Sequence, residues 1–476
     1  MTSVSAHKLG GYKLNFRSSF RNRSVLFAAP LAMLLAMSGH AWAQTSQDLP
    51  DYVIEEFGHL PNVPTGPLPE DLAAAAKVGL IDPIVLNIWD EDQMQAMEVL
   101  KNSGDPRLVW PISDLMRFIA SREMSAVFSG VANELLGLEL DPNENNWGPI
   151  TDHLMTWDIP APPDYLTYKK TIFAGLVPAW EPLFVEGDID WRYVSWGGVL
   201  IDGRPHDATD EPCNCIPAAD NPEVSSAEDA TWLRESDIVF GVEVNGEYRA
   251  YPRQIMEVRE MVNDTLGGRD LGIPYCTLCG SAQAYFTDDL PEGLERPILR
   301  TSGLLSRSNK VMYDLNTHSV FDTFLGHAVT GPLAEAGVKL NQATVVTTDW
   351  ASWRAAHPET TVLLEKYALG RDPDFRNTRD ADGPIFPIGD VDPRLPVHED
   401  VIGVVTDTGT PVAFPRATSL IALTQGEPVG FENVTLELDA GGIKAVGHDG
   451  EDLGSHQAFW FAWSQFHPET ALWKPE

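Results

Sequence analysis

Two sequence elements occur twice along this chain, in the same order. Residues 238–252 read IVFGVEVNGEYRAYP and residues 401–416 read VIGVVTDTGTPVAFPR, so both contain Val-x-Gly-Val followed by Ala-aromatic-Pro. Each is followed by Trp-x-x-x-His-Pro-Glu-Thr, at residues 353–360 and 463–470. Elements that recur in this way indicate one supersecondary unit that is built twice.

The first of these elements predicts a β-hairpin. Val242 and Val244 alternate with a polar residue, and Asn245-Gly246 supplies the two positive φ values that a type I′ turn needs. We therefore expect an α+β fold whose C-terminal domain is strand-rich and internally duplicated. The duplicated units lie near residues 238–360 and 401–470.

The N-terminus has the features of an export signal. Five basic residues precede the apolar run VLFAAPLAMLLAM, and small residues follow at AWA, residues 41–43. We expect residues 1–43 to be a cleaved signal peptide and the protein to be periplasmic or secreted; a membrane anchor is the alternative. No later stretch reaches the length of a transmembrane helix, so no integral membrane segment is expected after cleavage. The five basic residues are Lys8, Lys13, Arg17, Arg21 and Arg23.

The chain is strongly acidic. Its formal charge of −36 becomes −41 when the five positive charges of the signal peptide are removed, because that segment contains no acidic residue. A chain of this charge repels nucleic acid, which is bound through clustered Lys and Arg. We therefore expect no nucleic-acid partner, and the sequence identifies no other physiological partner.

Residues 44–68 are predicted to be a flexible lead-in, and residues 69–164 a small helical module. Within that module, Asp105 is a plausible N-cap with Pro106 at the first helical position. Apolar residues then recur at helical spacing. These residues are Leu108, Ile112, Leu115 and Ile119, followed in the next helix by Met124, Val127, Phe128, Val131 and Leu135.

From residue 165 to the C-terminus the chain resembles a known family. The motifs WGGVLIDG, IPAADNPEV, GVEVNGEYRAYP, EMVNDTLGG, PYCTLCGSA, SGLLSRSNKVMYD, GPLAE and FWFAWSQFHPET occur in family order. Together they resemble the DUF3179 family, a domain of unknown function. The resemblance implies a shared α+β fold over residues 165–476, and it supplies no reaction.

Two departures from the family pattern bear on a site. The family usually runs from Asp-Gly directly into Ile-Pro, whereas here the insertion RPHDATDEPCNC separates Gly203 from Ile216. The family also tends to have a histidine where this chain has Arg259. If a family site uses that histidine, this chain lacks the site or has rebuilt it with other ligands.

The four cysteines form two close pairs, Cys213 with Cys215 and Cys276 with Cys279. Our leading hypothesis is a metal site at the Cys-x-x-Cys motif, completed by Cys213 and Cys215 from the insertion. Four thiolates suit Zn or Fe. A mixed set including His206 suits Cu or Zn, and His318 and His327 are alternative ligands for it. Haem attachment is excluded, because the motif is followed by glycine and not by histidine.

Two alternatives remain open at this point. The cysteines could be structural disulfides of a non-catalytic binding or scaffold module, in which case we expect bridges between the two pairs and not a Cys213–Cys215 bridge. The Cys-x-x-Cys pair could also act in thiol–disulfide exchange. Its flanks are typical of strand and turn, whereas reactive pairs usually lie at a helix N-terminus. Whether the chain is an enzyme stays undecided.

A second candidate site consists of polar residues in the motifs MVNDTLGG and RTSGLLSRSNK. Asn263, Asp264, Ser302 and Asn309 could bind a small polar molecule. For Asn263 and Asp264, capping of backbone groups is the expected role. For residues 300–310, we expect a solvated edge strand. His357 and His467, which precede Pro-Glu in the two repeats, are expected to be structural.

Overall fold

The computed structural model of the chain describes residues 51–206, 208, 211–365 and 383–475. The predicted signal peptide and the first residues of the lead-in lie outside the described residues. By its internal contacts the chain forms two compact units, one ending at Leu176 and the other beginning at Val177. Among the described residues, no helix combines the length and the apolar run that a membrane span requires.

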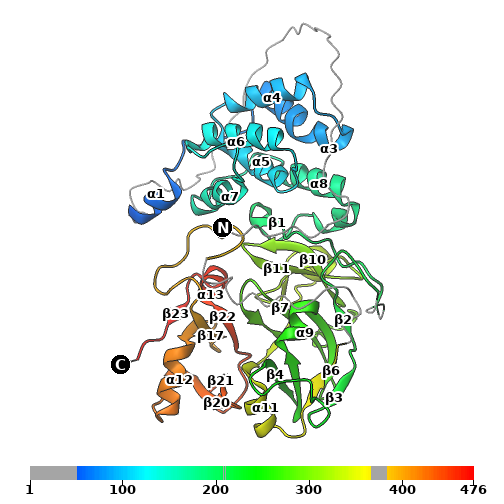
Figure 1. The fold of residues 1–476 in the computed structure, drawn as a ribbon, viewed down its shortest axis with the longest axis vertical. Helices are drawn as coiled ribbons and strands as arrows, with labels where there is room; N and C mark the ends of the chain where they lie inside the picture. The colour runs from blue at the N-terminus through cyan, green and yellow to red at the C-terminus, as the bar shows by residue number, and fades with distance from the viewer. Residues whose placement is uncertain (1–50, 207, 209–210, 366–382, 476) are drawn as a thin grey trace. The chain divides into compact units, whose positions relative to one another are not determined.

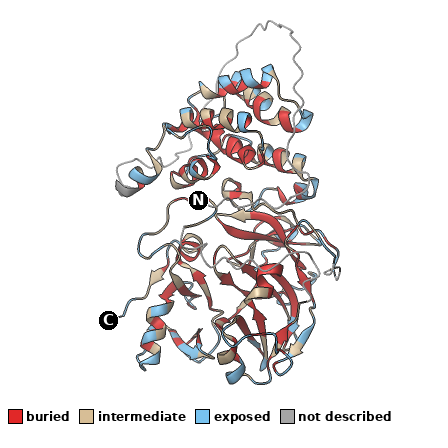
Figure 2. Cartoon of the chain, viewed as in Figure 1, coloured by how far each residue is buried: buried red, intermediate tan, exposed pale blue. Residues whose placement is uncertain are grey.

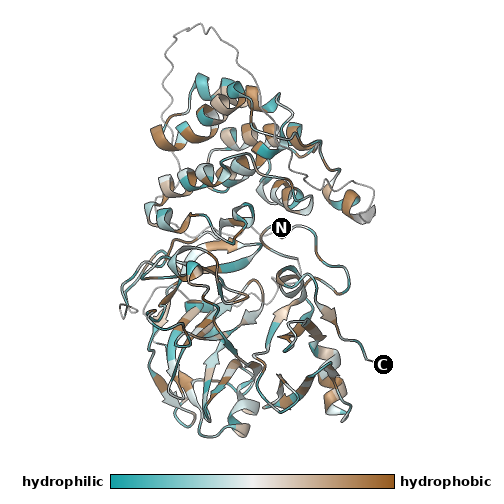
Figure 3. Cartoon of the chain, turned by 180° about the vertical axis from the view of Figure 1, so that it is seen from behind, coloured by the Kyte–Doolittle hydropathy of each residue, from teal (hydrophilic) through white to brown (hydrophobic). Residues whose placement is uncertain are grey.

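The first unit is helical and is coloured blue to teal in Figure 1. Figure 3 shows hydrophobic and hydrophilic residues on the same helices, as amphipathic helices require. Its elements are α1 (Asp51–Phe57), α2 (Glu70–Ala76), a π-helical turn (Lys77–Ile81), α3 (Asp82–Leu86), α4 (Glu91–Lys101), a 3₁₀ turn (Pro106–Leu108), α5 (Val109–Met116), α6 (Arg122–Leu136), α7 (Trp147–Thr156) and α8 (Tyr165–Leu176).

The predicted start of the helical segment at Asp105 is confirmed. The Asp105 side chain accepts a hydrogen bond from the Arg107 N–H at 3.1 Å, and Pro106 is the first residue of the turn that leads into α5. The apolar faces of α5 and α6 are buried, as their spacing predicts, with Ile112 and Phe128 almost fully inaccessible to solvent.

The second unit is built from short sheets, connected by the helices α9 (Arg253–Arg259), α10 (Gly331–Glu335), α11 (Trp350–Ala356), α12 (Arg416–Thr424) and α13 (Trp460–Phe466). One sheet has the order β1 (Val194–Trp196), β10 (Leu299–Ser306), β11 (Asn309–Asp314), β12 (Val320–Asp322) and β13 (His327–Ala328). A second has the order β14 (Gln342–Ala343), β9 (Ala284–Phe286), β7 (Arg269–Cys276), β6 (Met261–Leu266) and β2 (Ala219–Asp220), with β8 (Ser281–Ala282) paired to β7.

The remaining sheets include the two predicted repeats. The first repeat forms β15 (Val345–Asp349), β4 (Ile238–Val244), β5 (Glu247–Pro252) and β16 (Thr361–Leu363), with β3 (Val224–Ser226) at the edge. The second forms β22 (His456–Phe459), β17 (Asp400–Val405), β18 (Pro411–Pro415) and β23 (Ala471–Leu472). A small separate sheet contains β19 (Gly430–Phe431), β20 (Val434–Asp439) and β21 (Gly442–Val446).

The two repeats have the same connections between strands. In both, a hairpin leads into a helix, a later strand pairs antiparallel with the first hairpin strand, and a last strand pairs parallel with the second. Asn245 and Gly246 have φ values of 52° and 81°, so the predicted hairpin turn is confirmed. An origin by internal duplication stays a prediction that this shared topology supports.

The same glycine and tryptophan pack together in each repeat. A Cβ atom on Gly241 would lie 2.2 Å from a ring carbon of Trp353, and one on Gly403 would lie 2.1 Å from a ring carbon of Trp463. Both indole N–H groups donate to the threonine of the His-Pro-Glu-Thr element, Thr360 in the first repeat and Thr470 in the second. The repeated sequence elements therefore encode one packing arrangement.

Replacement of Gly403 by alanine is expected to destabilise the second unit by about 1–3 kcal/mol, because the added methyl group overlaps the Trp463 ring. Urea denaturation measures this loss. Gly203 is the matched control, since a Cβ there meets no atom within 4 Å and its φ is not positive. Equal stability of the two alanine variants would contradict the packing argument.

The prediction of a solvated edge strand at residues 300–310 is wrong. β10 lies between β1 and β11, and its residues Leu299–Leu304 are buried, as the red strands of Figure 2 show for this sheet. Arg300 is fully buried, and its guanidinium binds both carboxylate oxygens of Asp220. This polar segment can form a central strand because its charged side chains have buried partners.

Candidate functional site

The Cys-x-x-Cys motif forms the turn between two antiparallel strands. Cys276 is the last residue of β7, and its register partner Ser281 begins β8. The Cys279 N–H donates to the Cys276 carbonyl oxygen at 3.2 Å, and Gly280 adopts a φ of 61°, a conformation that favours glycine. The prediction that the motif is flanked by strand and turn is confirmed.

The second repeat contains no cysteine but covers this turn. The Phe459 N–H donates to the Cys279 carbonyl oxygen at 2.8 Å, and the Phe459 ring lies so close to Gly280 that a Cβ there would be 3.0 Å away. Trp460 and Phe461 of the same segment belong to the apolar cluster that encloses both cysteines. The two thiols are consequently buried, with exposed fractions of 2% for Cys276 and 0% for Cys279.

The two sulfur atoms lie 2.8 Å apart. Ser308, in the turn between β10 and β11, directs its carbonyl oxygen at both of them, at 3.6 Å from Cys276 and 3.7 Å from Cys279. The Asn309 Oδ1 atom lies 3.5 Å from the Cys279 sulfur. One strand turn therefore presents the thiols and another supplies their polar neighbours.

A buried lysine completes the surroundings of the pair. The Lys310 ammonium donates to the carbonyl oxygen of Tyr275 at 2.6 Å and to that of Glu260, and it lies 3.1 Å from a carboxylate oxygen of Glu260. Glu260 ends α9 with a left-handed φ of 50°, which brings its backbone and carboxylate to the same cation. Lys310 and Glu260 are both buried, so this ion pair is held in a fixed position.

The electrostatics of this arrangement act on Cys276. Burial raises the pKa of the Cys276 thiol, whereas the hydrogen bond from Cys279, the charge of Lys310 and the Lys310 backbone N–H lower it. The lowering effects prevail over burial and over the opposing charge of Glu260, so the pKa lies below the ordinary 9.0. Cys276 thus ionises more readily than an ordinary thiol, as nucleophiles and metal ligands require.

A small pocket lies beside the pair. Its volume is about 170 Å³, and its lining includes Asn309, Lys310, Arg307 and Asp322. Burial raises the pKa of Asp322 to about 6, although two backbone N–H groups oppose this. Lys310 was not among the candidate site residues of the sequence analysis. The signal that could have singled it out is a lysine directly before the apolar residues Val311 and Met312, at the start of the strand Asn309–Asp314.

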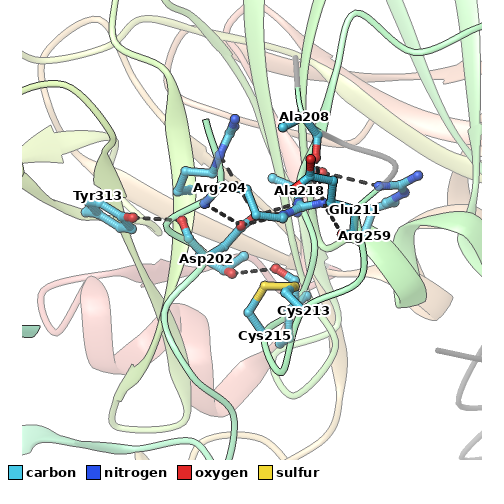
Figure 4. The surroundings of a disulfide bond; sticks show 12 residues. Asp202, Arg204, Ala208, Glu211, Cys213, Cys215, Ala218, Arg259 and Tyr313 are labelled. Carbon is cyan, nitrogen blue, oxygen red and sulfur yellow. Dashed lines mark hydrogen bonds and ion pairs between the residues drawn. A yellow bond between two sulfur atoms is a disulfide. The ribbon is translucent and has the colours of Figure 1, made fainter. Parts of the chain in front are cut away.

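The inserted loop carries a disulfide of its own. Cys213 and Cys215 are joined to each other, with their Cα atoms 5.1 Å apart (Figure 4). The expectation that bridges would form between the two cysteine pairs is therefore wrong. The chain turns at the intervening Asn214, and the resulting Cα separation lies in the range that disulfides span. Cys276 and Cys279 are free thiols.

Asp202 lies beside this disulfide and is already bonded to other groups. Its carboxylate accepts two bonds from the Arg204 guanidinium at 2.7 Å and one from the Ala218 N–H at 2.8 Å (Figure 4). Asp202, Cys213 and Cys215 form a candidate metal-binding group by their proximity. The chemistry of the set fits an ion poorly, because two sulfurs are oxidised and the carboxylate is held by an arginine.

The described residues do not bring the four cysteines into one ligand set. Across 51–206, 208, 211–365 and 383–475, Asp202 with Cys213 and Cys215 is the single group of three or more potential ligands within 4.8 Å of one another. It includes neither Cys276 nor Cys279. His206 is exposed and does not belong to it either. The hypothesis of a shared four-thiolate site therefore has no support in the geometry.

Removal of the Cys213–Cys215 disulfide by serine substitution is expected to cost only about 1–2 kcal/mol, because the bridge closes a very short loop. Thermal unfolding of the double variant measures this cost. The redox properties of Cys276 and Cys279 should be unchanged in it. A changed midpoint potential of that pair would show that the two cysteine pairs are coupled after all.

Three of the four predicted polar-site residues form hydrogen bonds with other groups of the protein. The Asn263 amide donates to Asp220 at 2.8 Å and to the Leu299 carbonyl oxygen at 3.0 Å. Asp264 accepts bonds from Arg249 at 2.7 Å and from the Tyr251 hydroxyl at 2.8 Å. Ser302 donates to the Val311 carbonyl oxygen at 2.5 Å. Asn309 alone lies at the thiol pair.

Arg259, which stands where the family tends to have histidine, is part of a buried ion pair. Its guanidinium bonds to the carboxylate of Glu365 and donates to the Ala218 carbonyl oxygen at 3.3 Å. Ala218 also donates to Asp202, so Arg259 lies next to the base of the inserted loop (Figure 4). The arginine therefore anchors the region into which the insertion folds.

Comparison with protein-family models gives a match described as "Protein of unknown function (DUF3179)", over residues 213–451. The matched region is half of the chain and contains the Cys-x-x-Cys turn, Lys310 and the first repeat. Comparisons with curated proteins and with solved structures give no match.

Proposed function

The chain belongs to the DUF3179 family, whose function is unknown, and we propose from its site that it is an exported thiol–disulfide redox protein. The working group in this proposal is the Cys276–Cys279 dithiol. Its reaction partner is a low-molecular-weight disulfide, because thiols this deeply buried exclude the surface of another protein. The pocket at Asn309 and Lys310 is the approach to the pair.

The observation that carries this proposal is the 2.8 Å separation of the two sulfurs, together with the lowered pKa of Cys276. Two thiols this close can form an intramolecular disulfide with little movement. Since the thiolate is the nucleophile in exchange, Cys276, whose pKa is lowered, is the attacking thiol. Lys310 stabilises that thiolate without forming a covalent bond to it.

The reaction is a two-electron exchange. The Cys276 thiolate attacks one sulfur of the small disulfide, forms a mixed disulfide and releases one thiolate. The Cys279 thiol then attacks the Cys276 sulfur, and its proton passes to the second leaving sulfur. The substrate gains two electrons and becomes one thiolate and one thiol, while the protein becomes the Cys276–Cys279 disulfide.

Export supports this proposal. The N-terminal segment has the pattern of a signal peptide, and a periplasmic or secreted protein works in an oxidising compartment. The Cys213–Cys215 disulfide fits the same environment. In that setting a dithiol that stays reduced needs a functional reason, and reversible exchange provides one.

A second candidate function is the binding of one soft metal ion by the same two cysteines. The lowered pKa of Cys276 favours a thiolate, and soft thiolate ligands select Cu(I). Zn and Fe need more ligands than this turn supplies among the described residues. The metal hypothesis is thereby reduced from four thiolates to a two-thiolate Cu(I) site.

Equilibration against glutathione and dithiothreitol mixtures from about −320 to −120 mV tests the redox proposal. Alkylation under denaturing conditions, followed by intact-mass measurement, counts the free thiols at each potential. We expect both thiols to be lost together in one two-electron transition. The variant with Cys276→Ser and Cys279→Ser should show no transition in this range.

A wild-type protein without any transition across that range would refute the redox proposal. Purification of the protein with one copper ion per chain, and with both thiols protected from alkylation, would favour the second candidate. The Cys213→Ser, Cys215→Ser variant separates the two cysteine pairs in either experiment.

A further inference from the structure

A second, larger cavity lies between the second repeat and a segment that contains Phe324, His327 and Gln342. Its volume is about 390 Å³, which is in the range of small-molecule sites. Aromatic side chains form much of the wall, and three histidines reach it from different segments: His327, His456 and His467. Among the described residues that line it, none is an Asp, Glu, Lys or Arg.

The cavity is located where the two repeats differ. In the first repeat, the Tyr248 ring stacks on His357 with centroids 4.0 Å apart, and Trp353 lies on the histidine as well. In the second repeat, His467 lies against Trp463 with centroids 4.1 Å apart. The position equivalent to Tyr248 lies two residues before Ala413 and is Pro411, which has no aromatic ring to stack on the histidine.

His456 is committed to the protein. The Gln342 amide nitrogen lies 3.0 Å from its Nδ1 atom and also donates to the Gly454 carbonyl oxygen at 2.6 Å. Nδ1 must therefore accept, and Nε2 carries the proton in the neutral ring. The Gln283 amide nitrogen lies 3.4 Å from Nε2, while the Gln283 Oε1 atom has no hydrogen-bond partner. Exchange of the amide nitrogen and oxygen lets that oxygen accept the Nε2 proton.

His327 and His467 are not committed in this way. Neither side chain makes a hydrogen bond to another residue in the described part of the chain, and both line the cavity. Burial lowers the pKa of His467 to about 4, with a further contribution from His327. Burial, followed by Lys339, lowers the pKa of His327 as well, although Asp188 opposes this. Both imidazoles are neutral near pH 7.

The lining determines what the cavity can hold. A charged ligand would lose its hydration without meeting an opposite charge, which is costly in an apolar site. A planar uncharged ring can stack between the aromatic walls and place a polar edge at the free imidazole nitrogens. A preformed three-ligand metal site is not supported, since among the described residues no three His, Cys, Asp or Glu side chains here bring their ligand atoms within 4.8 Å of one another.

We propose that the cavity bounded by Phe324, Trp463 and His467 binds a small uncharged aromatic or heteroaromatic molecule, hydrogen-bonded to His327 and His467. This site goes beyond the proposed thiol chemistry and does not depend on it. The absence of a covering tyrosine in the second repeat turns a structural histidine into a ligand-binding one.

Isothermal titration calorimetry with three related probes tests the proposal on the full mature chain. Indole is uncharged, indole-3-acetate is its anionic relative and tryptamine its cationic relative. We expect indole to bind with a Kd below about 1 mM. The two charged probes should bind at least tenfold more weakly, because the described lining offers them no counter-charge.

Three variants place the binding in this cavity. Pro411→Tyr supplies the ring that Tyr248 provides in the first repeat and should weaken indole binding at least tenfold. His467→Phe keeps an aromatic ring but removes the polar edge, with the same expected loss. His357→Phe, the matched change in the first repeat, should leave the Kd within twofold of the wild-type value.

The proposal is overturned if indole at about 1 mM does not bind the wild-type chain, because the expected Kd lies below that concentration. It is equally overturned if folded Pro411→Tyr or His467→Phe protein binds indole as tightly as the wild type does. Because the two variants change different residues, failure of one to fold leaves the other decisive.

Discussion

Replacement of Lys310 by methionine is expected to raise the pKa of the Cys276 thiol. The ammonium group lowers this pKa in the wild-type protein, and Glu260, which acts in the opposite direction, remains in the variant. Ultraviolet thiolate absorbance as a function of pH measures the shift. The titration should move to higher pH, and exchange with a small disulfide at neutral pH should slow accordingly.

The same substitution should cost about 3–5 kcal/mol of stability, since it leaves the buried Glu260 carboxylate without its cation. The double variant Lys310→Met, Glu260→Gln is the control. It should recover most of the stability while the thiol pKa stays above the wild-type value, because Lys310 affects Cys276 more strongly than Glu260 does. An unchanged thiol titration in both variants would refute the assigned role of Lys310.

The lowered thiol pKa also has a consequence for stability as a function of pH. A group whose pKa is depressed by folding contributes stability that is fully present above its unfolded pKa. That contribution is lost as the pH falls through the folded-state pKa of Cys276. The unfolding free energy of the wild type, relative to that of Cys276→Ser, should therefore increase as the pH rises from the folded-state pKa to the unfolded-state pKa of this thiol.

Replacement of Arg300 by methionine should have the largest effect on stability, about 3–5 kcal/mol or more. Arg300 is fully buried and binds both oxygens of Asp220, and its Nε atom lies 3.9 Å from Asp202. The substitution would leave the buried Asp220 carboxylate without a counter-charge in the sheet that supports the thiol site. Urea denaturation measures the loss.

Arg269 provides the matched control for Arg300. Its guanidinium also bonds to both oxygens of one aspartate, Asp288, but this pair is partly exposed, with 36% and 26% of the two side chains accessible. Arg269→Met should therefore cost less than about 1 kcal/mol. Similar losses for the two variants would mean that burial does not set the strength of these pairs.

Local sequence signals predicted the elements that depend on nearby residues. The Asn245-Gly246 turn, the Asp105 cap and the strand-and-turn flanks of the Cys-x-x-Cys motif all follow from short-range preferences. The repeated sequence elements predicted that two parts of the chain share one arrangement of strands. The Gly241–Trp353 and Gly403–Trp463 contacts explain why those letters recur.

The features that the sequence did not predict depend on the folded path of the chain, mostly through partners that are distant in sequence. Residues 300–310 have the composition of a surface strand, and only the fold supplies Asp220 as the partner that allows Arg300 to be buried. The disulfide within the insertion depends on the local path of the chain at Asn214. The pairing of Lys310 with Glu260 joins the end of a helix to a distant strand.

The proposed role of His467 depends on the absence of an aromatic residue that would stack on it. Its letters are the same as those around His357, and sequence reasoning gave both histidines a structural role. The difference arises two residues before Ala413, where Pro411 replaces the tyrosine of the first repeat. The motif itself does not show whether another segment of the fold places an aromatic ring on its histidine.

Differential alkylation with peptide mapping tests the central claim most directly. The chain, expressed with its own N-terminal segment, is labelled with one reagent after mild oxidation or reduction, and with a second after full reduction. We predict that Cys276 and Cys279 change label together while Cys213 and Cys215 remain bridged to each other. A peptide linking the two pairs, or a Cys276 label that is identical after oxidation and reduction, would contradict the account.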